Sequence, residues 1–236
     1  MISLRGVSLV YPNGVHALDN ITLEIAKSDF VFLVGHSGTG KSSLMRLLYR
    51  EARPTAGEIV VDGIRVDRLK NSRVPTLRRH LGVVFQDFKL LSDKTVWENV
   101  AFAMQVTGAH TREVMRQVPR VLELVGLSHK SRMYPNELSG GEQQRTAIAR
   151  ALVNNPKILL CDEPSGNLDP SNTTEIMELL LRINLKGTTV VVATHNQAVV
   201  DRMRRRVVRL EDGRIVTDEE RGYYYLGLGQ GQVLSG

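Results

Sequence analysis

Eight consecutive residues carry the clearest chemical signal in this sequence. The stretch from Gly35 to Ser42 fits the pattern G-x-x-x-x-G-K-[ST] at every fixed position. Glycines let successive backbone N–H groups turn toward one point without Cβ clashes, and a helix that begins there adds a partial positive charge. Such a loop cradles a polyphosphate, with Lys41 reaching the β- and γ-phosphates and the Ser42 hydroxyl ligating Mg²⁺. The stretch therefore predicts a binding site for a nucleoside triphosphate.

The flanking residues have the order that this loop requires. Residues 29–34 form an apolar run of strand length, and Leu44, Met45, Leu47 and Leu48 recur at helical spacing. A glycine turn followed by an exposed lysine is the ordinary alternative, and the order of strand, loop and helix disfavours it. The loop alone does not distinguish kinases, GTPases and ATPases.

Two adjacent carboxylates, Asp162 and Glu163, follow a second apolar run. Because strand alternation points neighbouring side chains to opposite sides, we expect them to have different roles. Asp162 is expected to hold the Mg²⁺ shell, and Glu163 to polarise the attacking water. Surface carboxylates at a strand end are the alternative, but this pair after a buried run is costly without a cation.

A second anion-binding helix start is expected at Ser139, Gly140 and Gly141, within the stretch Leu-Ser-Gly-Gly-Glu-Gln-Gln-Arg over residues 138–145. The helix itself is expected over residues 146–153. Two such sites in one chain need two phosphate groups, or one phosphate shared between two chains.

Three more side chains are candidates for ligand contacts. Gln86 follows a strand expected over residues 82–85, where open α/β sheets place ligand groups, so it could contact Mg²⁺ or the attacking water; a capping role is the alternative. His195 follows the strand expected over residues 188–193, and its position beside the other strand ends favours function over a purely structural role. Tyr11 could stack on a nucleobase, although its residue type alone favours covering the edge of the core.

The composition suits a globular protein with an anionic partner. The chain has 236 residues, 42% of them hydrophobic, and 31 Lys and Arg against 25 Asp and Glu give a formal charge of +6. The single Cys161 excludes an internal disulfide and suits a reducing compartment. No uninterrupted apolar run of about 18 residues occurs, so we expect a cytoplasmic chain that does not span a bilayer by itself.

The order of patterns predicts one α/β domain over residues 1–221. Strands over residues 2–9 and 21–25 indicate a small antiparallel sheet ahead of the phosphate loop. Two helical patterns between Thr95 and Gly126 predict a helical subdomain, spanning about residues 88–150, whose Trp97, Phe102 and Met104 fill its core or line a groove for a partner helix. Residues 222–236, rich in Gly and Tyr, are expected to form a flexible tail.

Together these motifs resemble the nucleotide-binding domain of ABC ATPases, in the order that family has. The resemblance implies a P-loop NTPase core with a mainly parallel sheet, an N-terminal antiparallel β subdomain and an inserted α-helical subdomain. It implies MgATP hydrolysis by in-line attack of water, with Glu163 as base, His195 holding water and γ-phosphate, and Lys41 neutralising developing charge. It also implies a dimer that forms head to tail on ATP binding, in which Ser139 and Gly141 contact the nucleotide of the other chain.

The resemblance assigns the remaining site residues as well. Tyr11 falls where the family stacks adenine, and Mg²⁺ is expected on Ser42, Gln86 and Asp162. The residues expected to contact ATP are Tyr11, Gly35, His36, Ser37, Gly38, Thr39, Gly40, Lys41, Ser42, Ser43, Gln86, Ser139, Gly140, Gly141 and Asp169.

Within the family, the chain is most similar to the branch that serves bacterial cell division, through residues 83–91, 99–104 and 163–169. That likeness implies an integral membrane partner, peripheral association with the cytoplasmic face of the membrane at the division site, and activation of peptidoglycan hydrolases. The alternative is the ATP-binding subunit of a lipoprotein or macrolide exporter, because those relatives also have the stretch Leu-Ser-Gly-Gly-Glu-Gln-Gln-Arg with glutamate at the position of Glu142. A nucleic-acid partner is not expected, because such relatives usually have tandem domains or a long insertion.

Overall fold

A computed structural model describes residues 1–224 of the chain, which form two sheets and a helical region. The first sheet, called here the N-terminal sheet, is antiparallel and has the strand order β2-β1-β4-β5. Its strands are β1 (Ile2–Val10), β2 (His16–Ile25), β4 (Ala56–Val61) and β5 (Ile64–Arg65). The expected strands are present, and both extend beyond their expected limits.

The second sheet, called here the core sheet, is mainly parallel and has the order β10-β9-β3-β8-β7-β6, with only β10 antiparallel to its neighbour. Strands β3 and β8 are buried along their whole length, as parallel strands covered on both faces should be. The strands are β3 (Phe30–Val34), β6 (Leu81–Val84), β7 (Ile158–Asp162), β8 (Thr189–Ala193), β9 (Arg206–Glu211) and β10 (Arg214–Glu219).

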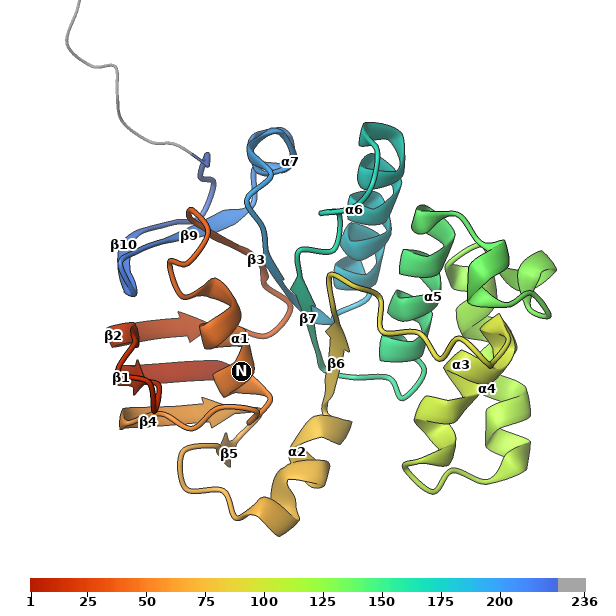
Figure 1. Cartoon of the computed structure of the whole chain (residues 1–236), viewed down its shortest axis with the longest axis horizontal. Helices are drawn as coiled ribbons and strands as arrows, with labels where there is room; N and C mark the ends of the chain where they lie inside the picture. Colours follow the sequence, from red (N-terminus) through yellow and green to blue (C-terminus); the bar gives the residue numbers. More distant parts are fainter. Residues whose placement is uncertain (225–236) are drawn as a thin grey trace, which may run out of the picture.

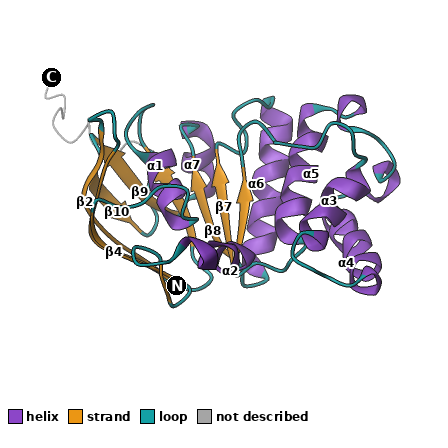
Figure 2. Cartoon of the chain, turned by 60° about the horizontal axis from the view of Figure 1, so that its bottom comes forward, coloured by secondary structure: helices purple, strands orange, loops and turns teal. Residues whose placement is uncertain are grey.

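Figures 1 and 2 show α3, α4 and α5 gathered on one side of the molecule, opposite the N-terminal sheet. The helices are α1 (Lys41–Leu48), α2 (Val74–Arg79), α3 (Val96–Gln105), α4 (Thr111–Leu124), α5 (Gly140–Leu152), α6 (Pro170–Leu185) and α7 (Gln197–Met203), with short 3₁₀ turns at Asn71–Arg73, Ser128–Lys130 and Pro135–Glu137. The architecture is the expected α/β fold with an inserted helical subdomain.

Alternation along β3 divides the interior into two hydrophobic cores. Phe30 and Phe32 pack with residues of α3 to α6, whereas Val31 and Leu33 pack with α1 and the N-terminal sheet. The core sheet is therefore held between the helical subdomain and the N-terminal sheet, and its strand ends lie between them.

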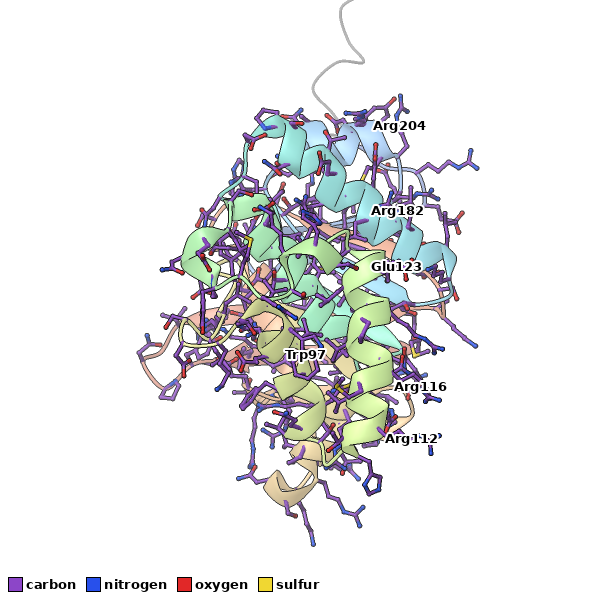
Figure 3. The ribbon with its side chains drawn as sticks, turned by 90° about the vertical axis from the view of Figure 1, so that its right-hand side faces the viewer. Trp97, Arg112, Arg116, Glu123, Arg182 and Arg204 are labelled. Atoms are coloured by element: carbon purple, nitrogen blue, oxygen red, sulfur yellow. The ribbon has the colours of Figure 1, made fainter. Side chains whose placement is uncertain are left out.

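The helical subdomain turns an apolar face inward and a charged face outward. On α4, Val114 and Val118 are buried, while Figure 3 shows Arg112, Arg116 and Glu123 along the outer side. In α3, Met104 is buried and Trp97 is partly buried against the same core. Phe102, by contrast, is 39% exposed.

Phe102 instead lines a groove of about 610 Å³ between α3 and the core sheet, which Val83, Phe85 and Val106 also border. Trp97 and Met104 therefore belong to the core and Phe102 to a groove, and binding of a partner helix in this groove stays a prediction.

Side-chain caps fix the starts of four helices; at α7, the Asn196 side chain accepts from the Val199 backbone N–H over 3.2 Å. Thr95 with Glu98 and Ser139 with Glu142 form reciprocal capping boxes at α3 and α5. The pair Asp169-Pro170 predicts an N-cap followed by the first residue of a helix, and Asp169 does cap α6, with Pro170 at the first helical position. Each cap lies next to a loop that carries candidate site residues.

Three local expectations differ from the structure. The helix expected from Thr146 begins at Gly140 instead, because the capping box of Ser139 starts it. Residues 65–80 are rich in Arg and Lys, which favours a solvated face without a helix, but the segment contains α2, which buries Leu77. Of the tail expected to be flexible from Gly222, residues 222–224 pack against the domain, with Tyr224 only 6% exposed; residues 225–236 lie outside the described part of the chain.

Within residues 1–224, no helix combines the length and apolar character needed to cross a membrane.

Candidate active site

A cavity of about 610 Å³ lies at the carboxyl ends of the core-sheet strands. It brings together segments that are far apart in the sequence: the loop after β3, the loop after β6, and the turns after β7 and β8. Its lining residues are His36, Ser37, Gly38, Gly40, Lys41, Ser42, Ser43, Gln86, Glu163, His195, Gln197 and Tyr224.

The glycines of the loop after β3 are required by close backbone contacts. Gly35 has φ 146°, and a Cβ there would overlap the carbonyl oxygen of Leu210. Gly40, with φ 100°, caps α1, and its Cβ would lie 2.5 Å from the carbonyl oxygen of Ala17. Only glycine fits these positions, so the N-terminus of α1 is held at the edge of the cavity.

Lys41 is folded against the loop that precedes it. Its Nζ donates to the carbonyl oxygens of Gly35 over 2.7 Å and His36 over 2.9 Å, and the residue is 7% exposed. Burial lowers the pKa of Lys41, while the nearby carboxylates of Glu163 and Asp162 oppose that change. The ammonium is thus held by backbone carbonyls that phosphate oxygens could replace.

Ser42 and Asp162 join α1 to the end of β7. The Ser42 hydroxyl donates to Asp162 Oδ1 over 3.2 Å. Burial raises the pKa of the Asp162 carboxyl; the Ser42 hydrogen bond opposes the rise and the nearby Glu163 adds to it. A hydroxyl and a carboxylate that is partly removed from water are oxygen donors suited to Mg²⁺.

Gln86 reaches the cavity from the loop after β6. The backbone carbonyl oxygen of Gln86 accepts from Asn167 Nδ2 at 3.5 Å, and its side-chain amide nitrogen lies close to Gly166. An amide oxygen at this place would extend the same oxygen donor set. Among residues 1–224, no cluster of three or more His, Cys, Asp or Glu side chains provides a metal site.

Glu163 and His195 contact each other in the lining of the cavity. His195 Nδ1 lies 2.8 Å from Glu163 Oε1, and the backbone N–H of His195 donates to Glu163 Oε2 over 3.3 Å. Glu163 is 9% exposed and has φ 48°, beyond the end of β7. The left-handed backbone at Glu163 therefore sets the direction of its side chain. The different directions of the Asp162 and Glu163 side chains do not come from strand alternation, which the sequence prediction assumed.

Several candidate residues lie away from the cavity lining. The Tyr11 hydroxyl is 3.1 Å from Ser43 Oγ, and its ring is packed against the core beside α1. The Thr39 hydroxyl donates to the His36 carbonyl within the loop. Gly35 and Asp162 do not line the cavity either, but each contacts a residue that does. The remaining candidates, Ser139, Gly140, Gly141 and Asp169, lie at the starts of α5 and α6.

The starts of α5 and α6 pack against each other. A Cβ on Gly141 would overlap the side chain of Asn172, whose backbone N–H donates to Asp169 Oδ1 over 3.0 Å. None of Ser139, Gly140 and Gly141 lines the cavity that Lys41 lines, so within one chain the start of α5 is separate from it.

Two lining residues were not candidates in the sequence. Gln197 begins α7 just after His195, so its nearness to a strand end could have indicated it. Tyr224 comes from the C-terminal segment, and no spacing in the sequence connects it to the loop after β3.

Comparison with known proteins gives consistent matches. Residues 18–166 match the family model described as ABC transporter. The cell division ATP-binding protein FtsE of Streptococcus pneumoniae serotype 2 is 54% identical over 224 residues, which cover 95% of this chain and 97% of that protein. The methionine import ATP-binding protein MetN of Carboxydothermus hydrogenoformans is 45% identical over 92% of this chain and 66% of its own length.

Among solved structures, a dimeric ATP-binding cassette in a post-hydrolysis state, bound to ADP and inorganic phosphate, superposes with a TM-score of 0.85. It is 36% identical in sequence, and the match covers 94% of this chain and all of that one. The chain therefore belongs to the ABC transporter family and is an ATP-hydrolysing cassette of that family.

Proposed function

We propose that this chain hydrolyses MgATP as a head-to-tail dimer and drives a conformational change in an FtsX-like membrane protein, which activates peptidoglycan hydrolysis in bacterial cell division. The family supplies the ATPase activity, and the similarity to FtsE supports the cell-division role. One observation supports the dimer: Ser139, Gly140 and Gly141, at the start of α5, lie outside the cavity of their own chain.

Binding begins with exchange of partners at Lys41. Its Nζ leaves the carbonyls of Gly35 and His36 for the β- and γ-phosphates, which are stronger acceptors because they are charged. The backbone N–H groups between Gly35 and Ser43 and the N-terminus of α1 hold the phosphates, and the Tyr11 ring stacks on adenine.

The residues present fit Mg²⁺. The Ser42 hydroxyl, the Asp162 carboxylate and the Gln86 amide provide hard oxygen donors around the cavity. When bound there, the ion would neutralise charge on the phosphate oxygens. Burial disfavours the charged form of Asp162 and so raises the pKa of this carboxyl. The positive charge of the ion would offset that cost.

Hydrolysis requires a water in line with the γ-phosphate. Glu163 accepts a proton from that water, and His195, held on the same carboxylate, contacts the water and the γ-phosphate. Lys41 stabilises the negative charge that develops as the bond to the γ-phosphate breaks.

The second chain completes the site. Ser139, Gly140 and Gly141 at the start of α5 of one chain contact the γ-phosphate held by the other, with Asp169 beside them. The solved post-hydrolysis cassette is itself a dimer bound to ADP and inorganic phosphate, which supports this arrangement. ATP then joins the two chains, and hydrolysis lets them separate.

The membrane partner would bind in the groove lined by Phe102 and Val106, close to the loop that carries Gln86. Closing and reopening of the dimer would move whatever occupies this groove. The chain would thus lie at the cytoplasmic face of the membrane through its partner. The second candidate is the ATP-binding subunit of a lipoprotein or macrolide exporter. The 45% identity to MetN, a methionine import protein, supports a transport role in general but not export.

The test is capture of the membrane partner. Tagged Glu163→Gln protein, expressed in its host and solubilised gently with MgATP, is expected to retain a membrane protein of the FtsX type, while Lys41→Ala protein retains less because it binds ATP weakly. Recovery of an export permease would favour the second candidate. Recovery of ribosomes or DNA without a membrane protein would contradict both.

A further inference from the structure

The C-terminal segment, residues 222–224, lies against the nucleotide cavity. Tyr224 is 6% exposed and lines the cavity with the phosphate-loop residues. The family motifs assign nothing to this segment, and the sequence predicted it to be flexible. Its contacts instead attach it firmly at the edge of the site.

Three contacts hold the segment on the region around α7, the first of which is the Gly222 backbone N–H that donates to the Arg205 carbonyl oxygen over 3.2 Å. The Tyr224 backbone N–H donates to Asp201 Oδ1 over 2.7 Å, and the Tyr223 ring lies 3.9 Å from the guanidinium carbon of Arg204. Asp201 belongs to α7, the helix that follows His195. The side chain of Tyr224 therefore extends from a fixed backbone toward the phosphate loop.

The Tyr224 hydroxyl ends on a carbonyl that Lys41 also uses. It donates to the Gly35 oxygen over 3.2 Å, and Lys41 Nζ donates to the same oxygen over 2.7 Å. A carbonyl oxygen has two lone pairs and can accept both bonds. Gly35 is buried, so this oxygen depends on protein donors.

ATP binding removes one of these two donors. When Lys41 turns to the phosphates, the Gly35 oxygen would lose its partners if Tyr224 were not present, and an unsatisfied buried carbonyl is unfavourable. We propose that Tyr224 is a positioning residue of the nucleotide site, whose hydroxyl holds the Gly35 carbonyl while Lys41 binds phosphate. The inference rests on the phosphate role proposed for Lys41.

The conservative variant Tyr224→Phe tests this role. It keeps the buried ring and the backbone bond to Asp201, and loses only the hydroxyl. Because Lys41 can still satisfy Gly35 without nucleotide, the melting temperature of the free protein should stay close to that of the wild type. The dissociation constant and the KM for ATP should both rise about fivefold, as expected for one net hydrogen bond, while kcat at saturating ATP changes less than about twofold.

Two further variants sharpen the test. Tyr223→Phe, the matched control, removes a hydroxyl but keeps the ring over Arg204, and should bind ATP as the wild type does. Asp201→Ala releases the backbone of Tyr224 and should weaken ATP binding, and adding Tyr224→Phe should then cause little further loss, because the two act through one contact.

Fluorescent-nucleotide titration separates the outcomes. Wild-type affinity in Tyr224→Phe, with binding lost in Lys41→Ala, would overturn the role of Tyr224 alone. Wild-type affinity in Lys41→Ala would overturn the phosphate role of Lys41 and this inference with it. Weaker binding in Tyr224→Phe but not in Tyr223→Phe, with an unchanged melting temperature, supports the inference.

Discussion

His195 contacts Glu163 twice, with Nδ1 2.8 Å from Oε1 and the backbone N–H 3.3 Å from Oε2. A neutral imidazole that donates from Nδ1 has its acceptor at Nε2. The carboxylate therefore fixes the orientation of the ring, and the backbone N–H of His195 fixes the carboxylate. Glu163, which we propose as the general base, and His195 thus form one oriented unit.

Removing the ring should affect hydrolysis more than binding. In His195→Ala, kcat should fall about 100-fold or more, because the attacking water loses one of its partners, whereas the dissociation constant for ATP should change less than about threefold. Steady-state phosphate release and nucleotide titration measure the two effects. His129→Ala, an exposed histidine of the helical subdomain, is the control, and wild-type kcat in His195→Ala would contradict the role.

Lys41→Ala should weaken ATP binding itself. The ammonium is expected to make charge-assisted bonds to two phosphates, so its loss should raise the dissociation constant at least about tenfold. Lys27→Ala removes an exposed lysine and an equal charge without touching the cavity, and should bind ATP normally. An unchanged affinity in Lys41→Ala would contradict the phosphate role.

Asp162→Asn should stabilise the nucleotide-free protein. It should also remove the effect of Mg²⁺ on the affinity for ATP. Burial raises the pKa of Asp162, so the folded state binds more protons than the unfolded chain. The contribution of Asp162 to the free energy of unfolding should therefore fall as pH rises from about 4, the ordinary Asp value, through the raised folded pKa, and the difference between wild type and Asp162→Asn isolates it.

The asparagine has no such titration, and at pH 7 we expect it to increase the free energy of unfolding by about 1 kcal/mol. Urea unfolding at several pH values, together with ATP binding with and without Mg²⁺, checks both effects. A variant that is less stable than the wild type at pH 7, or that keeps the full effect of Mg²⁺ on ATP affinity, would argue against this role.

Glu142→Gln isolates the charge of the α5 capping box. Glu142 Oε1 lies 2.7 Å from Lys130 Nζ, and Oε2 accepts from the Ser139 backbone N–H over 3.0 Å. The hydrogen bond with Lys130 is the main cause that lowers the pKa of Glu142. Glutamine keeps the cap but loses the ion pair, so the free energy of unfolding should fall by less than about 1 kcal/mol at pH 7.

The pH dependence gives the sign of this contribution. Because the pKa of Glu142 is lower in the folded protein, its ion pair contributes fully to stability above the unfolded Glu pKa of about 4.3. That contribution is lost as pH falls through the folded pKa. The stability difference between wild type and Glu142→Gln should shrink over that range. Glu142→Ala, which removes the cap as well, should be less stable than Glu142→Gln by about 1 kcal/mol; equal losses would show that the cap contributes nothing.

Local patterns in the sequence predicted the parts of the site that depend on neighbouring residues. The phosphate loop follows from fixed spacing, and the caps at Ser139 and Asp169 follow from residue type and position. The α/β fold and the helical subdomain follow from hydrophobic periodicity.

Such local patterns do not predict contacts between residues that are far apart in the sequence. The left-handed conformation of Glu163 has no marker in its residue type. Helix α2 buries only Leu77, so its sequence has almost no apolar periodicity. Tyr224 joins the site through contacts with Asp201 and Gly35, which are distant along the chain.

The central claim is that two chains share each ATP, and Glu163→Gln tests it most directly. The variant keeps the groups proposed to bind ATP and loses the base, so it should accumulate in the ATP-bound state. Size-exclusion chromatography with light scattering should give the mass of a dimer with saturating MgATP and of a monomer without nucleotide. The double variant Lys41→Ala, Glu163→Gln should remain monomeric, whereas a monomeric mass for Glu163→Gln in saturating MgATP would contradict the shared site.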